Sequence, residues 1–421
     1  MKKLISFVLL LLMAPVAHAD ESAAQSLAQE MSQLRVAVQD LKAVVDQQSR
    51  VIQAQGMKIE RLEGAASVAV QGPAAAVPAI SGRWNPEIGA VADIAGTCTN
   101  SKDNGEGEDR LSVRELEIVL GAAVDPYSRL DATVSFSDFE EASLEEAYLT
   151  RFDLPLGFTA RVGRVKPKVG KVLPNHRDSL ETVDEPLVIR RWFGVEGINK
   201  TGVDATAILD LPFDSSHEVT LGVLEGGNGE EGTLFGDRRR PTFYGHLKNY
   251  WELGDASGLE LGFSQMIGDK DGDSSSEVSL TGADLTWKNR FSENTELKLQ
   301  GEALYQNRRN SQYEVVDDTT GDISFNDLDG TLWGGYALAD LRFHPQWSAG
   351  FRWDYAEPVD NAVINPSRAD IGYAGYLTFY QSEFARWRAQ VSWLDGVDGK
   401  DDLQLMLQGT FAIGEHKHKI N

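Results

Sequence analysis

Residues 347–355 read WSAGFRWDY, and the order of apolar and polar side chains in this stretch decides the fold. Nearly every second residue from Trp347 to Tyr355 is apolar, while Arg352 and Asp354 hold polar positions between them. Successive side chains of a β-strand point to opposite faces, so a period of two predicts a strand with one apolar and one polar face. A strand of about 9–11 residues is also long enough to cross a bilayer at a tilt.

The same alternation recurs between Arg83 and Ile413, most clearly in residues 129–137, 387–393 and 403–413. A soluble sandwich would alternate too, but it would have to bury charged residues in a dry core without partners. Aromatic residues also stand at the ends of the expected strands, as they do in barrels that sit in lipid. They are Tyr148, Phe152, Trp251, Trp287, Tyr305, Trp347, Tyr355, Tyr373, Phe379, Trp387 and Trp393. The pattern favours an all-β transmembrane barrel with an apolar outside and a wet inside.

The connections between these stretches alternate in length, as in barrels of the outer membrane. Short turns are expected at 125–128, 153–157, 212–216, 254–258, 290–294, 344–346 and 381–385. Longer polar loops are expected at 97–109, 137–143, 167–200, 226–240, 268–276, 307–328, 356–367 and 395–401. Fifteen connections predict sixteen antiparallel strands, with eighteen left open as an alternative. A barrel of that size encloses a water-filled channel.

The N-terminus predicts export. Residues 1–19 have the layout of a secretory signal peptide: Lys2 and Lys3, a short apolar run, and a small-x-small site before Asp20. The chain carries a net charge of −24, which argues against nucleic acid as a partner. Its one cysteine, Cys98, leaves no intrachain disulfide to stabilise it.

Residues 20–63 are predicted to form an α-helical coiled coil that precedes the barrel. Apolar residues repeat with a seven-residue period between Leu27 and Leu62. A helix with so narrow an apolar stripe must bury it against another chain, and its β-branched residues favour a dimer. Residues 64–82 are then a linker, 83–414 the barrel and 415–421 a tail.

A basic segment at residues 161–191, which runs into the longest connection, is the candidate pore constriction and anion-binding site. Its residues are Arg161, Arg164, Lys166, Lys168, Lys171, Arg190 and Arg191. The connection also holds an apolar group from Leu187 to Phe193, which an exposed loop would not need. We therefore expect it to fold into the lumen, where fixed positive charge lowers the barrier for anions.

An alternative is that these cations pair with lumen carboxylates such as Glu115, Glu117 and Glu145, giving a general pore. The acidic total argues in the same direction, since acidic loops repel incoming anions.

The stretch GRVKPKVG at 163–170, with EEAYL at 145–149 and FDLP at 152–155, resembles the phosphate-selective porin O/P family. The resemblance covers roughly residues 83–413. It implies a trimer of sixteen-stranded barrels whose third long loop turns inward. A trimer conflicts with the dimer that the coiled coil favours, and we prefer it because barrel contacts should dominate.

The expected function is that of a porin in the bacterial outer membrane, open to passive diffusion of small hydrophilic solutes and leaning toward phosphate or other small anions. A sugar-specific porin and an envelope-spacing structural barrel are the alternatives. Expected partners are outer-membrane lipid and lipopolysaccharide, further copies of the chain, and peptidoglycan through the coiled coil. No enzyme, cofactor or metal site is expected, because nucleophile motifs are missing and histidine and cysteine are few.

Overall fold

The computed structural model describes most of residues 86–414. The segments left out of the description are 101–108, 139–141, 196, 210, 212–214, 227–233, 236–239, 270–276, 317–322, 358–368 and 398. The expected signal peptide, coiled coil, linker and tail all lie outside the described residues.

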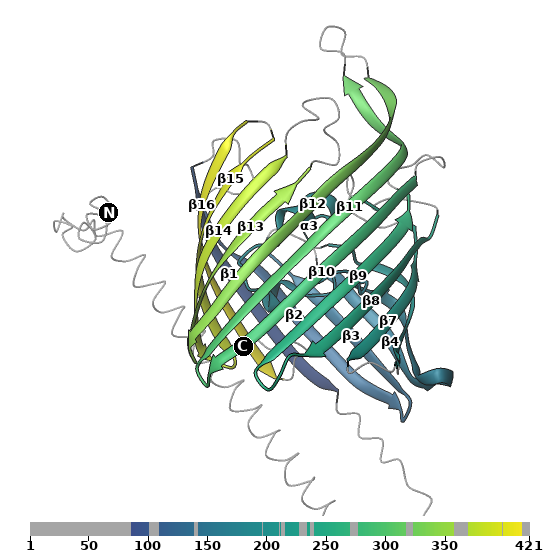
Figure 1. The fold of residues 1–421 in the computed structure, drawn as a ribbon, viewed down its shortest axis with the longest axis horizontal. Coiled ribbons are helices and arrows are strands. Elements are labelled where there is room, and N and C mark those ends of the chain that lie inside the picture. The colour runs from purple at the N-terminus through teal and green to yellow at the C-terminus, as the bar shows by residue number, and fades with distance from the viewer. Residues whose placement is uncertain are drawn as a thin grey trace, which may run out of the picture. The chain divides into compact units, whose positions relative to one another are not determined.

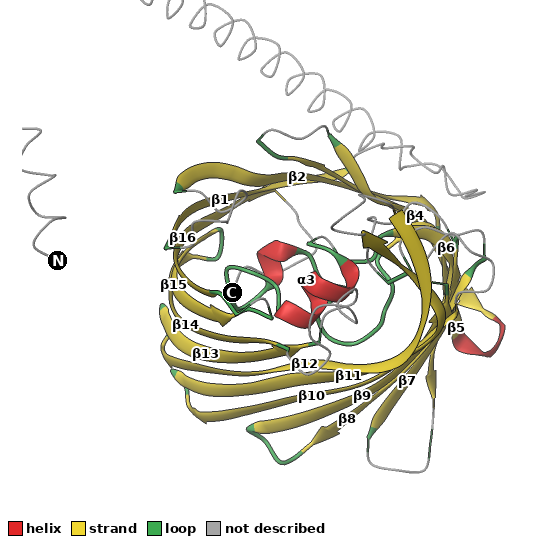
Figure 2. Ribbon diagram, turned by 90° about the horizontal axis from the view of Figure 1, so that it is seen from above, coloured by secondary structure: helices red, strands yellow, loops and turns green. Residues whose placement is uncertain are grey.

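Sixteen antiparallel strands close into a barrel within the described part of the chain (Figures 1 and 2). Their bounds are β1 Glu87–Thr99, β2 Arg110–Asp125, β3 Ser128–Phe136, β4 Ser143–Leu154, β5 Phe158–Val165, β6 Lys200–Leu209, β7 Ser216–Leu224, β8 Thr242–Glu252, β9 Ser257–Gly268, β10 Glu277–Ser292, β11 Thr295–Val316, β12 Ile323–His344, β13 Trp347–Ala356, β14 Asp370–Ser382, β15 Ala385–Asp395 and β16 Asp401–Gly414. Each strand pairs with its sequence neighbours, and β1 pairs with β16 to complete the ring. The predicted count of sixteen is confirmed.

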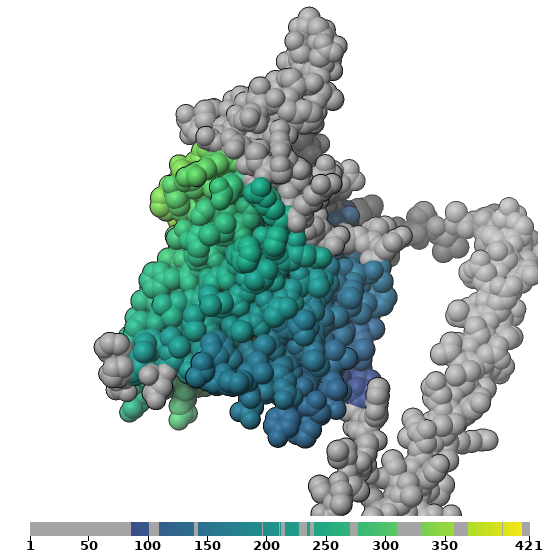
Figure 3. Space-filling model, turned by 90° about the vertical axis from the view of Figure 1, so that its right-hand side faces the viewer, coloured from purple at the N-terminus to yellow at the C-terminus, as the bar shows by residue number. Residues whose placement is uncertain are grey.

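The strand faces are inverted relative to a soluble protein. In β13 the side chains of Phe351 and Trp353 are 49% and 39% exposed, whereas those of Arg352 and Asp354 are 2% exposed. The same inversion runs round the barrel, and Figure 3 shows its outer wall as a continuous surface over the blue to green strands. Such a face needs an apolar medium or another protein surface to cover it.

Among the described residues, no helix is long and apolar enough to span a membrane.

One expected loop is largely strand. We predicted a loop at 307–328, but β11 and β12 continue as a hairpin, with Glu314 opposite Phe325. The alternation in this stretch is limited to Tyr313 with Val315 and Ile323 with Phe325, which is too short on either side of the polar residues 317–322 to predict strands. The long hairpin rises above the rest of the barrel in Figure 1.

The connection between β5 and β6, residues 166–199, folds into the lumen as predicted (Figure 2). We call it the inner segment. It contains two short helices, η2 Arg177–Ser179 and α3 Leu187–Phe193. Val188, Trp192 and Phe193 of α3 are at most 2% exposed, and they join a cluster with Leu304 and other inward residues of the wall. The core of the molecule therefore lies inside the barrel, around this segment.

Candidate functional site: the inner segment and its wall

Three wall arginines hold the middle of the inner segment. Arg352 on β13 donates to the Asp184 carbonyl at 2.6 Å and to the Asp184 carboxylate at 3.1 Å. On β15, Arg386 donates to the Asp178 carbonyl at 2.7 Å, and Arg388 to the carbonyls of Leu180 and Thr182, both at 2.9 Å. We call Arg352, Arg386 and Arg388 the arginine clamp. The backbone carbonyls of a loop have no neighbouring strand from which to accept hydrogen bonds, and the N–H groups of the arginine clamp serve as donors to them.

The carboxylates of the clamped stretch stay ionised. Glu185 accepts a hydrogen bond from Arg177 at 2.8 Å, and Glu181 one from Lys298 on β11. Burial raises the pKa of Glu181, Asp184 and Glu185, but the neighbouring cations outweigh burial and hold each pKa below its usual range. Protonation at low pH would therefore weaken the hold on this stretch.

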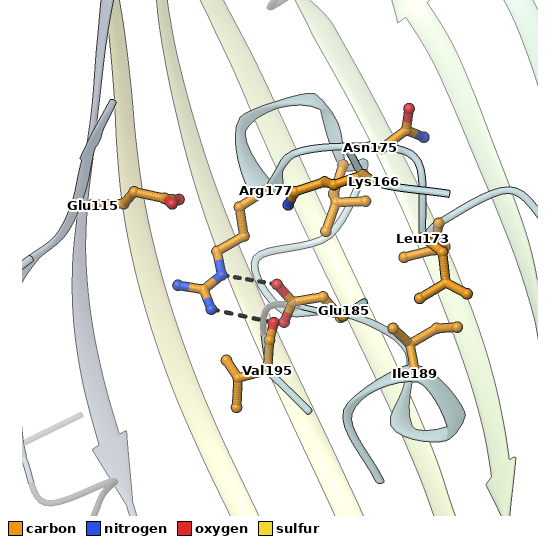
Figure 4. Close-up of a pocket in the computed structure, with 11 residues that line it drawn as sticks. Glu115, Lys166, Leu173, Asn175, Arg177, Glu185, Ile189 and Val195 are labelled. Atoms are coloured by element: carbon orange, nitrogen blue, oxygen red, sulfur yellow. Dashed lines mark hydrogen bonds and ion pairs between the residues drawn. The ribbon is translucent and has the colours of Figure 1, made fainter. Parts of the chain in front are cut away.

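A small pocket lies between the wall and the inner segment (Figure 4). Glu115 faces it from β2, and Lys166, Arg177 and Glu185 from the inner segment. Among the residues that line the pocket, Arg177 donates hydrogen bonds to Glu185 and, at 3.3 Å, to the Val195 carbonyl. The pocket holds about 20 Å³, roughly the room of one water molecule.

The predicted site residues Arg161 and Lys166 are paired with wall carboxylates. The Arg161 guanidinium contacts Asp204 on β6 at 2.5 Å and lies 5.2 Å from the centre of the Tyr148 ring. Tyr148, expected in an outer girdle, thus faces the lumen. The Lys166 Nζ is 3.6 Å from Glu145 Oε2, and its side chain is 6% exposed.

Lys168 and Lys171 also have partners on the wall. Lys168 Nζ donates to Thr206 Oγ1 at 3.1 Å, and Lys171 forms an ion pair with Glu260 on β9. Burial lowers the pKa of Lys168, although nearby carboxylates oppose the shift.

Arg164 lies apart from this group. The unbroken pairing of β5 with β6 sets Arg164 opposite Thr201, on the face that carries Val162. Val162 is 51% exposed, so alternation assigns Arg164 to the outer face of the barrel.

Arg190 and Arg191 on α3 keep the most exposure of the set. Arg190 is 34% exposed with Asp184 at 3.8 Å, and Arg191 is 48% exposed with Asp370 at 2.7 Å. The structure thus brings Arg161, Lys166, Lys168, Lys171, Arg190 and Arg191 to the lumen side, each next to a carboxylate or hydroxyl. Their role at a constriction stays a prediction.

Sequence reasoning named Glu115, Glu117 and Glu145 as lumen carboxylates but missed Glu146 and His176, which complete a buried cluster on the wall at β2 and β4. Glu115 and Glu117 on β2, Glu145 and Glu146 on β4, and His176 of the inner segment are all at most 7% exposed. His176 Nδ1 lies 3.0 Å from Glu117 Oε1 and 3.0 Å from Glu145 Oε2, and its Nε2 lies 3.0 Å from Glu146 Oε2. We call these five residues the histidine–glutamate cluster.

The cluster favours positive charge at its centre. Burial and Lys166 act to lower the pKa of His176, but its contacts with three carboxylates outweigh them and raise that pKa well above its usual value. Among the described residues, Glu117, Glu145 and His176 form the group whose ligand atoms could hold a metal ion, all within 4.8 Å of one another.

Comparison with known proteins identifies the architecture. No family model matches the chain. An uncharacterized protein of Aquifex aeolicus (strain VF5) is 26% identical over 335 residues, which cover 73% of this chain and 69% of that protein. The anion-selective porin from Comamonas acidovorans superposes with a TM-score of 0.51 at 10% identity, over 78% of this chain and 99% of the porin. The chain has a porin fold.

A second solved structure agrees. The outer membrane channel DcaP of Acinetobacter baumannii gives a TM-score of 0.50 at 12% identity, over 78% of this chain and 96% of DcaP. At these identities the likeness concerns the porin fold alone, and membership of the phosphate-selective O/P family stays a prediction.

Proposed function

We propose that this chain is an outer-membrane porin through which small hydrophilic solutes diffuse passively. The observation that carries the proposal is the inverted barrel: apolar side chains outside, charged side chains inside, and an inner segment that narrows the lumen. An apolar belt with a charged interior suits a wall between lipid and a water-filled path. The predicted signal peptide supplies the route of export.

The narrow part of such a path sets ionic preference, because there a solute exchanges water for contacts with the protein. Arg161 on β5 and Lys166 and Lys171 of the inner segment are paired with wall carboxylates, which limits any net field. The side chains of Arg190 and Arg191 also have acidic neighbours, but they are 34% and 48% exposed and so more accessible to a passing solute. We therefore propose a weak anion preference carried by these two side chains. A structure with the same fold is named an anion-selective porin, and the O/P resemblance points to phosphate as one such anion.

We further propose that the barrel assembles as a homotrimer in lipid, as the family resemblance implies. Cross-linking of the purified protein in detergent tests this directly, and a ladder that ends at the dimer or the monomer contradicts it.

Single-channel recording in planar bilayers tests the function and its selectivity. Under a gradient of KCl, the wild type should conduct with a reversal potential that indicates a higher permeability for Cl⁻ than for K⁺. The double variant Arg190→Gln, Arg191→Gln should have a reversal potential that indicates a higher relative permeability for K⁺, because it lacks two exposed positive charges of α3. The control is Arg290→Gln, a residue 65% exposed at the end of β10 beside a short turn.

A protein that folds and inserts but never conducts would contradict the channel. An unchanged reversal potential in the double variant would contradict the role of Arg190 and Arg191 while leaving the channel in place.

A further inference from the structure

The histidine–glutamate cluster is assembled from three separate parts of the chain. Glu115 and Glu117 are alternate residues of β2, so both point inward. A bulge in β4 lets the consecutive residues Glu145 and Glu146 point inward together, since Thr133 pairs with Glu146 while Val134 pairs with Leu144. The inner segment then delivers His176 between the two strands. Bulges often re-aim side chains beside functional sites.

Carboxyl groups outnumber basic side chains in the cluster. Four carboxyl groups meet His176 and Lys166 in a place where no side chain is more than 7% exposed. Buried carboxylates are costly unless they are paired or bind a metal ion. The next basic side chain, Arg177, donates its hydrogen bond to Glu185.

Glu145 is the unsatisfied member. Its side chain is 1% exposed, and its oxygens contact His176 and Glu115 without a hydrogen bond of good geometry. Lys166 Nζ, at 3.6 Å, is too far away for one. His176 Nδ1 is equally close to Glu145 and Glu117, at 3.0 Å from each, yet its single N–H can donate well to only one of them.

We propose that Glu117, Glu145 and His176 bind one divalent transition-metal ion of the zinc type, held between β2, β4 and the inner segment. Imidazole and carboxylates are common ligands of Zn²⁺, at about 2.0–2.2 Å, and imidazole selects such ions over Mg²⁺ and Ca²⁺. An ion bonded to Nδ1 bridges the two carboxylates that one N–H cannot serve together. The pocket beside Glu115 has room for a water molecule as a further ligand.

The remaining members of the cluster take supporting positions. His176 Nε2 lies 3.0 Å from Glu146 Oε2, so its N–H donates to a carboxylate while Nδ1 faces the ion. Metal-binding histidines almost always have such a partner, which fixes the ring and raises its basicity. The bound ion would tie the inner segment to the wall at β2 and β4, in addition to its hold by the arginine clamp at β13 and β15. This inference is independent of whether the barrel conducts.

The test is Zn²⁺ binding to the full chain, stripped with chelator and folded in detergent, measured by equilibrium dialysis with metal analysis. A variant with His416→Ala and His418→Ala removes the histidines of the tail as a source of adventitious binding. In that background one tight equivalent of Zn²⁺ should remain, and excess Mg²⁺ should not displace it. Adding His176→Ala or Glu145→Gln should abolish it, and Glu146→Gln should weaken it about 10–100-fold.

Heat-modifiable migration in gels verifies that each variant folds, and Glu145→Gln keeps the side-chain shape if His176→Ala does not fold. Co²⁺ in place of Zn²⁺ reports the ligands directly through its visible absorption. The proposal is overturned if no tight equivalent survives loss of the tail histidines, or if Glu145→Gln binds Zn²⁺ as tightly as its parent. Loss of conductance with Zn²⁺ binding intact would contradict the proposed function and leave this site standing.

Discussion

Glu145 and Glu146 show how a single inserted residue changes the inside of a barrel. In a regular strand one of the two would face outward, but the β4 bulge turns both inward. A similar irregularity in the pairing of β1 with β2 lets Arg114 reach Asp93 beside Glu115. Neither bulge can be predicted from period-two alternation, because a bulge inserts one residue and so interrupts the alternation itself. Glu115, Glu117 and Glu145 could therefore be predicted as lumen carboxylates, but the inward turn of Glu146 and the approach of His176 could not. The inward Arg352 and Asp354 of a regular strand could be predicted.

Gly163 is the residue that lets β5 lie against β4. Its φ is +138°, and a Cβ there would lie 2.1 Å from the Ala147 carbonyl oxygen and 2.7 Å from the Tyr148 Cα. Gly163→Ala should therefore lower the free energy of unfolding by more than the conformational cost alone, because backbone atoms must also move. Unfolding by urea in lipid vesicles measures this.

Gly157 provides the matched control for that substitution. It also has a positive φ, +74°, but a Cβ there meets nothing within 4 Å. Gly157→Ala should cost only the left-handed penalty of about 1–2 kcal/mol. Equal losses for the two variants would show that close approach of β4 and β5 is not what Gly163 provides.

At the scale of elements, the inner segment is held at two separate parts of the wall by groups of opposite charge. The arginine clamp of β13 and β15 donates hydrogen bonds to backbone carbonyls of the segment. The carboxylates of β2 and β4 contact its His176 and Lys166 side chains. The apolar run in α3 was enough to predict that this segment folds inward, since it needs a core. The clamp could not be predicted, because it depends on which wall residues meet which loop carbonyls.

Arg352 should be the critical member of the clamp. It contacts the carboxylates of both Asp184 and Asp354 and is 2% exposed, so Arg352→Met leaves Asp354 without its cation and Asp184 with only the more distant Arg190. Removing one partner of a buried ion pair typically costs about 3–5 kcal/mol. We expect the variant to release residues 178–185 from the wall, seen as new protease cleavage there in a barrel that otherwise stays folded.

Compensation tests whether uncompensated charge causes that release. Adding Asp354→Asn to Arg352→Met removes one of the orphaned carboxylates and should restore part of the protection. If the double variant is cleaved as fast as Arg352→Met, the lost hydrogen bonds to the loop backbone, and not the charge, dominate the hold.

At the largest scale, the described barrel is a ring that closes only if every strand keeps its register. β1 and β16 pair from Gly89 with Gly414 to Thr99 with Gln404. The number of strands could be predicted because each short turn interrupts the alternation at a visible point. The length of the β11–β12 hairpin could not be predicted, because the alternation near its tip covers only a few residues on each strand.

The outer belt should tolerate charge according to depth, if the proposed location in lipid is correct. Leu377 lies in the middle of β14 and is 43% exposed, while Phe384, 48% exposed, lies in the short turn between β14 and β15. An arginine near the middle of a bilayer costs a transmembrane barrel about 2–4 kcal/mol, and one near the interface about 0–1 kcal/mol. Leu377→Arg should therefore destabilise the folded barrel in lipid vesicles far more than Phe384→Arg, as measured by equilibrium unfolding. The difference should shrink in detergent, where the apolar layer deforms around the charge. Equal effects of the two substitutions in vesicles would mean that the outer face of β14 is covered by protein and not by lipid.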